Sequence, residues 1–228
     1  MANEPLIGVK ACLFDAYGTL FDFASAARNC RDLPADKMAS LTSLWRDKQL
    51  QYTWLRAVQG LHADFWDVTS DALSYSLETL SLDAKLHGRL MRLYLELEPF
   101  PEVPDVLARL KRAGIRMAIL SNGSPAMLQS AVDAAKLSHY FEAVISVEEV
   151  GVFKPHPKVY QLAIDRLDVA ADAIAFQSSN AWDAFAASAF GMRVVWCNRY
   201  GQRPERLPGR PDREIKTLVE LPSLLGVG

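Results

Sequence analysis

A regular alternation of helical and strand patterns fills the second half of this 228-residue chain and constrains its fold most strongly. Helical patterns alternate with short apolar runs, in the order 103–113, 116–120, 125–135, 143–145, 158–167, 173–176, 182–190 and 194–197. Strands separated by helices form a parallel sheet that helices cover on its faces. The pattern therefore predicts an α/β fold. The tail at 201–213 is rich in Pro, Gly and charge, which predicts a loop before a short final helix.

One more strand is predicted near the N-terminus, where the mostly apolar run 9–14 ends at Asp15. Such a run suits a strand buried on both faces of a sheet. Gly18 follows shortly and allows the backbone to turn closely. A carboxylate at the C-terminal end of a parallel strand lies where open α/β sheets bind ligands, so the position suits a nucleophile. The alternative is that Asp15 only begins a turn, as Asp often does after a strand.

A mainly helical segment interrupts the alternation between the first strand and the proline-rich stretch 99–104. Its first and longest helix carries an apolar stripe at Met38, Leu41, Leu44, Trp45, Tyr52, Leu55 and Val58. A second stripe on a neighbouring face contains Arg46, Leu50, Trp54 and Ala57. Helical patterns follow at 63–80 and 84–95. We interpret residues 23–97 as a helical cap, with Arg46 facing the site, inserted into a core of residues 1–22 and 98–228.

Composition excludes several classes of protein. With 50% hydrophobic and 23% charged residues the chain is typical of globular proteins, and its net charge of −2 provides no broad basic surface for nucleic acid or anionic membranes. Glu4 and Lys10 interrupt the N-terminus before a signal-like apolar stretch forms. Cys12, Cys30 and Cys197 are odd in number and contain no Cys-x-x-Cys pair for zinc. We expect buried thiols and a cytoplasmic location.

Polar residues follow two of the later strands. Ser121 and Asn122 come directly after the strand at 116–120, and Ser124-Pro125 resembles the start of a helix, whose free N–H groups bind carboxylate or phosphate. Lys154 lies in a loop after the next strand and would keep a nearby carboxylate ionised. The alternatives are that Ser124 only caps its own helix and that Lys154 is an ordinary solvated lysine.

The last polar group is the stretch 178–183, where a strand ends and a helix begins. Ser178, Asn180 and Asp183 are expected beside Asp15, because the carboxyl ends of parallel strands meet at one edge of the sheet. A magnesium-dependent site would need a denser set of carboxylates here, since Mg²⁺ is bound by anionic oxygens. The stretch therefore indicates a site without a metal.

Four stretches occur in an order that resembles the haloacid dehalogenase superfamily: Asp15-Ala16-Tyr17-Gly18-Thr19, Ser121-Asn122-Gly123-Ser124, Lys154-Pro155 and Ser178-Ser179-Asn180-Ala181-Trp182-Asp183. Most members of that superfamily are phosphatases with Asp-x-Asp at the first motif and an acidic pair at the last. Asp-x-Tyr combined with Ser-Ser-Asn-x-x-Asp is similar to the L-2-haloacid dehalogenases. Tyr17 stands where phosphatases carry the acid that protonates the leaving group, and a halide needs no proton to leave.

This resemblance implies a Rossmann-like parallel core with an inserted helical cap, and hydrolysis of small (S)-2-haloacids to (R)-2-hydroxyacids and halide. Asp15 would attack C2 and form an ester that water then cleaves. The implied catalytic residues are Asp15, Thr19, Arg46, Lys154, Ser178, Asn180 and Asp183. The implied substrate contacts are Tyr17, Arg46, Leu50, Phe65, Ser121, Asn122, Tyr160 and Trp182, and Trp45 is a further candidate for the apolar wall.

The resemblance implies no metal or other cofactor and no nucleic-acid or membrane partner, and it leaves a homodimer open. Two residues depart from the family pattern: Asp47 stands where Gln is frequent, and Gln177 where a small or apolar residue is more frequent. Two alternatives remain, namely a phosphatase of the same superfamily and a non-catalytic binding protein on this scaffold.

Overall fold

The computed structural model describes residues 4–227 and contains one parallel sheet. Its strands are in the order β3-β2-β1-β4-β5-β6. Their bounds are β1 (Ala11–Phe14), β2 (Arg116–Ser121), β3 (Ala143–Ser146), β4 (Ile174–Ser178), β5 (Arg193–Cys197) and β6 (Arg213–Ile215). The first strand thus lies at the centre, between β2 and β4. The predicted α/β class is confirmed.

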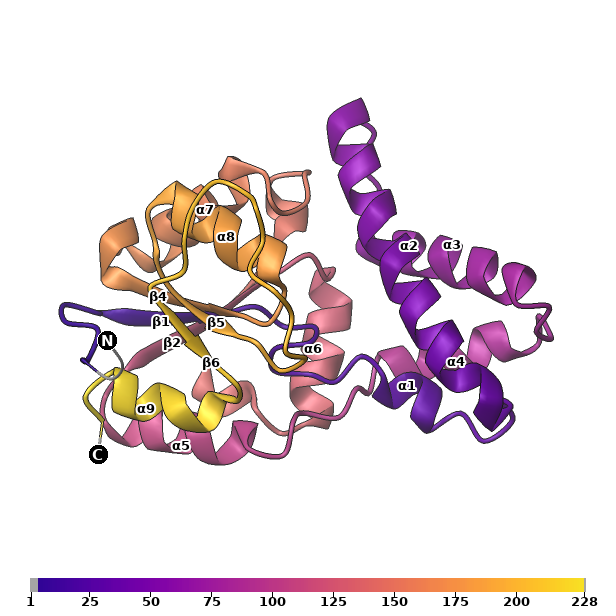
Figure 1. Cartoon of the computed structure of the whole chain (residues 1–228), viewed down its shortest axis with the longest axis horizontal. Helices are drawn as coiled ribbons and strands as arrows, with labels where there is room; N and C mark the ends of the chain where they lie inside the picture. Colours follow the sequence, from indigo (N-terminus) through magenta and orange to yellow (C-terminus); the bar gives the residue numbers. More distant parts are fainter. Residues whose placement is uncertain (1–3, 228) are drawn as a thin grey trace.

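Helices cover both faces of the sheet. They are α5 (Val103–Arg112), α6 (Pro125–Ala134), α7 (Pro157–Leu167), α8 (Ala181–Phe190) and α9 (Leu221–Leu224). In Figure 1, α7 and α8 lie on one face and α5 and α9 on the opposite face. Every residue of β1 is completely buried between these layers, as its unbroken apolar run predicts.

Strand β6 lies at the sheet edge and differs from the prediction of a loop through residue 213. It has only three residues, and of these only Ile215 is buried. Such a short and polar strand has no apolar alternation, so its pairing with β5 decides its structure. The four-residue helix α1 (Ser25–Arg28) was also missed, because it is too short to show a helical period.

Four helices lie to one side of the sheet: α1, α2 (Met38–Gln59), α3 (Phe65–Thr79) and α4 (Leu86–Tyr94) (Figure 1). The buried face of α2 carries Leu41, Trp45, Gln49 and Thr53, at a spacing of four. The predicted first stripe is therefore wrong in its second half, where Leu55 and Val58 are 50% and 88% exposed. In this half of the helix the polar residues Gln49 and Thr53 occupy the buried face. The apolar periodicity therefore identifies residues that lie on the exposed face.

The two chain segments that enter and leave this helical group run side by side. Phe21 forms an antiparallel bridge with Pro99, and the Asp22 N–H donates to the Glu98 carbonyl at 2.8 Å. Paired linkers keep the helical group at a defined place on the sheet. We propose that they mark the domain boundary, with a core of residues 1–22 and 98–228 and a cap of residues 23–97.

The three cysteines are free and buried. Burial raises the pKa of the Cys12 thiol to about 12 and that of Cys197 to about 11, so both thiols stay protonated at neutral pH. This agrees with the prediction that they serve in packing.

Among residues 4–227, no helix has both the length and the apolar character needed to cross a membrane.

Candidate active site

The predicted polar residues meet at the carboxyl edge of the sheet. Asp15 follows β1, Ser121 ends β2, Lys154 follows β3 and Ser178 ends β4. In this strand order the direction of winding reverses between β1 and β4, and open α/β sheets bind ligands in the crevice at such a point. Asp15 therefore lies where the fold forms a site.

Four side chains donate hydrogen bonds to the Asp15 carboxylate. Oδ2 accepts from Thr19 Oγ1 at 3.2 Å, from Ser178 Oγ at 3.4 Å and from Asn180 Nδ2 at 2.8 Å. Oδ1 accepts from Lys154 Nζ at 3.1 Å. These contacts fix the orientation of the carboxylate and leave Oδ1 with fewer donors than Oδ2.

Lys154 is 1% exposed and its ammonium lies between two carboxylates. Its Nζ is 3.1 Å from Asp15 Oδ1 and 2.9 Å from Asp183 Oδ2. Burial lowers the pKa of Lys154, but the charges of Asp15 and Asp183 outweigh it and raise that pKa above its usual value. The backbone N–H of Lys154 donates to Asn122 Oδ1 at 2.9 Å, which holds the loop in place.

Tyr160 lies beside Asp183 and does not line the small cavity above Asp15. Its hydroxyl donates to Asp183 Oδ1 at 2.8 Å. Burial, and then the charge of Asp183, holds the pKa of Tyr160 well above its usual range, so the phenol remains a donor. Asp183 thus has a donor on each oxygen. This contact suits a residue that orients Asp183, and the expected contact of Tyr160 with substrate stays a prediction.

These residues do not fit the magnesium ion that phosphatases of the superfamily use. Magnesium requires a near-octahedral set of oxygens. Here the carboxylates of Asp15 and Asp183 both bind the ammonium of Lys154, and Asn180 directs its NH₂ group toward Asp15. Within the described part of the chain, no three His, Cys, Asp or Glu side chains cluster as a metal site would require.

The cap reaches this site through Arg46 on α2. Arg46 Nη2 donates to Asn180 Oδ1 at 3.2 Å, while Asn180 Nδ2 donates to Asp15. The guanidinium also lies over the Phe23 ring, 5.2 Å from its centroid. A residue of the second predicted stripe thus faces the core, while the first stripe contributes Trp45 to the cap interior.

A small cavity of about 10 Å³ lies above Asp15, with room for roughly one water molecule. It is lined by residues of both the core and the cap, namely Asp15, Tyr17, Arg46, Leu50, Phe65, Ser121, Asn122, Lys154, Asn180 and Trp182. All of them are among the predicted site residues. Trp45 is the exception among the proposed apolar walls, because its indole N–H donates to the Thr69 carbonyl inside the cap.

Tyr17 forms part of the cavity wall. Its ring stacks on Phe65 at 5.9 Å between centroids and lies 5.4 Å from the ring of Tyr94. Burial raises the pKa of the Tyr17 phenol well above its usual range, so the hydroxyl is neutral. Among the described residues this buried hydroxyl has no hydrogen-bond partner. A Cβ atom on Gly123 would lie 2.9 Å from it, so a glycine is required there.

The start of α6 borders the cavity through Ser121. Its Oγ accepts from the Gly123 N–H at 3.1 Å. Ser124 is the N-cap residue and Pro125 the first helical residue, as the sequence predicts. The Ser124 side chain makes no capping hydrogen bond, so the alternative that it serves only as a cap loses its support.

Sequence reasoning missed Arg199, which follows β5 at the same edge of the sheet. Its Nη2 donates to the Thr19 carbonyl at 2.8 Å, and its Nη1 pairs with Glu102 at 2.6 Å. Thr19 Oγ1 accepts from the Ser179 N–H at 2.8 Å, so its own hydroxyl hydrogen is free for Asp15. The position of Arg199 just beyond a predicted strand was the signal that could have identified it.

A model of the haloacid dehalogenase-like hydrolases matches residues 9–191. The chain belongs to this family. Among its relatives, (S)-2-haloacid dehalogenase 1 of Pseudomonas sp. (strain CBS-3) is 43% identical over 221 residues, which are 95% of this chain and 96% of that protein. The (S)-2-haloacid dehalogenase 4A of Burkholderia cepacia is 41% identical, over 95% of each chain.

Solved structures agree with this assignment. The L-2-haloacid dehalogenase from Xanthobacter autotrophicus with chloropropionic acid covalently bound superimposes with a TM-score of 0.89 at 39% identity. The match covers 96% of this chain and 98% of that structure. The likeness therefore extends over both the sheet and the helices inserted between β1 and α5.

Proposed function

We propose that this protein is an (S)-2-haloacid dehalogenase that hydrolyses small (S)-2-haloacids to (R)-2-hydroxyacids and halide. One observation carries the proposal: a carboxylate held by four donors lines a small cavity that Arg46 of the cap also lines. Relatives named (S)-2-haloacid dehalogenases and a neighbouring structure with covalently bound chloropropionic acid support it.

In the first step, Asp15 Oδ1 attacks C2 of the substrate from the side opposite the halogen. The carbon–halogen bond breaks, its electron pair leaves with the halide, and an ester joins C2 to Asp15. Arg46 and Asn122 would receive the halide. Ser121 and the free N–H groups at the start of α6 would hold the substrate carboxylate. Arg46 acts where negative charge develops, so its effect belongs to the transition state.

In the second step, water attacks the carboxyl carbon of the Asp15 ester. The bond between the ester oxygen and that carbon breaks, and the water's oxygen stays in the Asp15 carboxylate. One proton of the water passes to the departing alkoxide, which leaves as the hydroxyacid, and the other is released to solvent. We propose that Asp183 and Asn180 orient this water, while Lys154 and Thr19 hold the carboxyl group. C2 is inverted once, because the second attack occurs at a different carbon.

The site must open before a substrate enters. A 2-haloacid contains several non-hydrogen atoms, whereas the cavity above Asp15 has room for roughly one water molecule. Leu50 and Phe65 from the cap and Trp182 from the core form its apolar walls. Closure of these walls around the substrate would exclude bulk water during the displacement.

A phosphatase reaction has little support at this site. It would need a group that protonates an alkoxide, and Tyr17 offers a neutral, strongly buried phenol in that position. It would also need carboxylates free to bind magnesium, whereas both carboxylates here bind Lys154. A binding protein without catalysis would not need four donors that hold the Asp15 carboxylate in one orientation.

The decisive experiment incubates the protein with each enantiomer of 2-chloropropionate, with and without EDTA, beside a generic phosphate ester. We expect the L enantiomer to yield D-lactate and chloride, with a rate that EDTA does not change. Retention of configuration at C2 would refute the single displacement. Phosphate release that EDTA abolishes, without chloride release, would establish a phosphatase, and no turnover at all would favour a binding protein.

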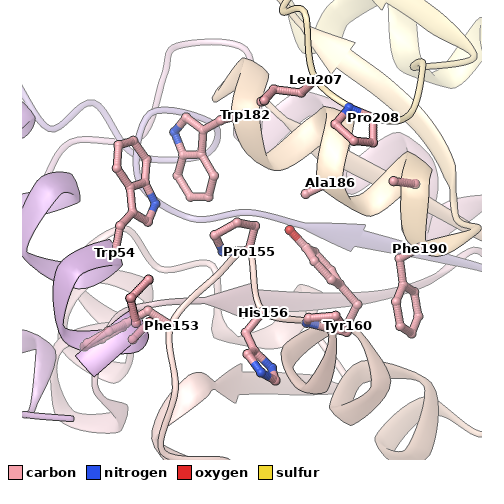
Figure 2. Close-up of a pocket in the computed structure, with 14 residues that line it drawn as sticks. Trp54, Phe153, Pro155, His156, Tyr160, Trp182, Ala186, Phe190, Leu207 and Pro208 are labelled. Atoms are coloured by element: carbon pink, nitrogen blue, oxygen red, sulfur yellow. The ribbon is translucent and has the colours of Figure 1, made fainter. Parts of the chain in front are cut away.

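We further propose that the protein acts as a homodimer in the cytoplasm. A groove of about 790 Å³ lies between α2 and the helices α7 and α8. Figure 2 shows its mainly apolar wall, with Trp54 beside Trp182, their ring centroids 5.4 Å apart, and with Leu207 and Pro208 at one side. Val58, also in this wall, is 88% exposed, and a second copy would remove it from water. Sedimentation of the parent and of Val58→Asp tests this, since a monomeric parent would refute it.

A further inference from the structure

We propose that Gln49 is a positioning residue that fixes the guanidinium of Arg46 for the displacement step, with Thr69 and Tyr94 as its supports. The proposal rests on the dehalogenase function proposed above and deepens it. Gln49 does not line the cavity above Asp15, so it would act only through Arg46.

Gln49 is a buried polar residue inside the cap, 1% exposed, on the face of α2 that packs against α3. A buried amide is retained only where hydrogen bonds satisfy it. Its Oε1 accepts from Arg46 Nη1 at 2.7 Å. Its Nε2 donates to Thr69 Oγ1 at 2.7 Å and to Tyr94 Oη at 3.1 Å. Every polar atom of this side chain thus has a partner.

The chemistry of Thr69 determines which way the Gln49 amide points. The Thr69 hydroxyl donates its hydrogen to the Phe65 carbonyl at 2.6 Å, so it can only accept from Gln49. The NH₂ group must therefore face Thr69, and the carbonyl oxygen must face Arg46. An amide held in this orientation presents an acceptor to a guanidinium, which has only donors.

Arg46 is consequently held from two sides. Gln49 binds Nη1 from within the cap, and Asn180 binds Nη2 from the core. Because the guanidinium is a rigid planar fork, two fixed nitrogens determine the direction of its remaining N–H groups. Loss of the Gln49 acceptor would let the fork rotate about its contact with Asn180, and the halide would lose an aligned donor.

The test is a double-mutant cycle between Gln49→Met and Arg46→Ala, with halide release measured at saturating 2-chloropropionate. Methionine has similar length and adapts to the packing around it but lacks the amide. We expect Gln49→Met to lower the rate about 10- to 100-fold, the range for one hydrogen bond to a charged group, with a smaller change in KM. In the Arg46→Ala background the same change should have no further effect.

Ser76→Ala is the matched control. Ser76 is a completely buried cap residue whose hydroxyl donates to the Ala72 carbonyl, and it does not line the cavity above Asp15. Its removal should lower the melting temperature without changing the rate. Equal losses from Gln49→Met in both Arg46 backgrounds, or no loss in the parent background, would refute the positioning role. If Gln49→Met fails to fold, Thr69→Val, which removes the acceptor for Gln49 Nε2, takes its place in the cycle.

A readout that does not need turnover separates this proposal from the proposed function. The side-chain ¹⁵Nε–H signal of Arg46, identified by its loss in Arg46→Lys, should be sharp in the parent and shift toward free arginine in Gln49→Met. An unchanged signal would refute the positioning role. A shifted signal in a protein that releases no halide would refute the dehalogenase function alone.

Discussion

Replacing Lys154 with methionine removes the ammonium that contacts both Asp15 and Asp183. The three side chains are 1%, 8% and 0% exposed, so neither carboxylate can replace the ammonium with bulk water. Loss of one partner of a buried ion pair costs about 3–5 kcal/mol. For a chain of this length each kcal/mol changes the melting temperature by roughly 2–4 °C, so we expect a decrease of roughly 6–20 °C.

The pH dependence of this loss follows from the charges. In the parent, the pKa of Lys154 is raised, so its contribution to stability is complete below the unfolded lysine value of about 10.4 and is lost as pH rises through the folded value. In Lys154→Met two carboxylates face each other, and the folded protein binds a proton more tightly than the unfolded chain. Lower pH therefore stabilises the variant, and its deficit should grow from about pH 5 to about pH 9.

Calorimetric melts of the parent, Lys154→Met and the control Lys158→Met at about pH 5, 7 and 9 measure this effect. Lys158 is exposed on the same segment, so its replacement should change stability by no more than about 0.5 kcal/mol. Halide release should be lost in Lys154→Met and retained in the control. A variant that melts with the parent at every pH would refute the buried ion-pair reasoning.

Three further variants test individual roles. Asp15→Asn should release no halide, which ion chromatography checks, and should lose less stability than Lys154→Met, because Lys154 keeps Asp183 as its partner; turnover by the folded variant would exclude Asp15 as the nucleophile. Arg46→Ala should lower halide release about 100- to 1,000-fold, more for 2-chloro- than for 2-bromopropionate, because the poorer leaving group depends more on the guanidinium. Equal losses for both halides would argue against a contact with the leaving halide. Tyr160→Phe removes a donor to Asp183 and should slow ester hydrolysis, so mass spectrometry should detect an Asp15 adduct, whereas an unmodified protein with a normal rate would exclude this orienting role.

Much of the core and the site follows from local sequence. The run before Asp15 is apolar at every position of β1, which only a central, doubly covered strand satisfies. The alternation after residue 103 requires a parallel sheet, and parallel strands bring their carboxyl ends to one edge. Ser121, Lys154 and Asn180 were therefore predictable neighbours of Asp15, although they lie far from it along the chain.

The rotation of the cap helix was not predictable in the same way. On α2 the buried face continues from Trp45 to Gln49 and Thr53, while Leu55 and Val58 face outward. Apolar periodicity identifies a buried face only where apolar residues cover it. The amide of the buried Gln49 is satisfied by Thr69 and Tyr94 on other helices. No spacing along the chain predicts that these residues are its partners.

By itself, the sequence determined the α/β class, the inserted helical segment and the set of residues at the strand ends, because periodicity and strand order are local properties. The tertiary structure alone decided that Tyr160 binds Asp183, that Arg199 holds Thr19 and that β6 completes the sheet. It also decided that Arg46 meets Asn180 across 134 positions of sequence. The first three of these contacts lie within the core and depend on which loops the sheet brings together. The contact of Arg46 with Asn180 depends on how the paired linkers orient the cap on the core, and neither geometry exists before the chain has folded.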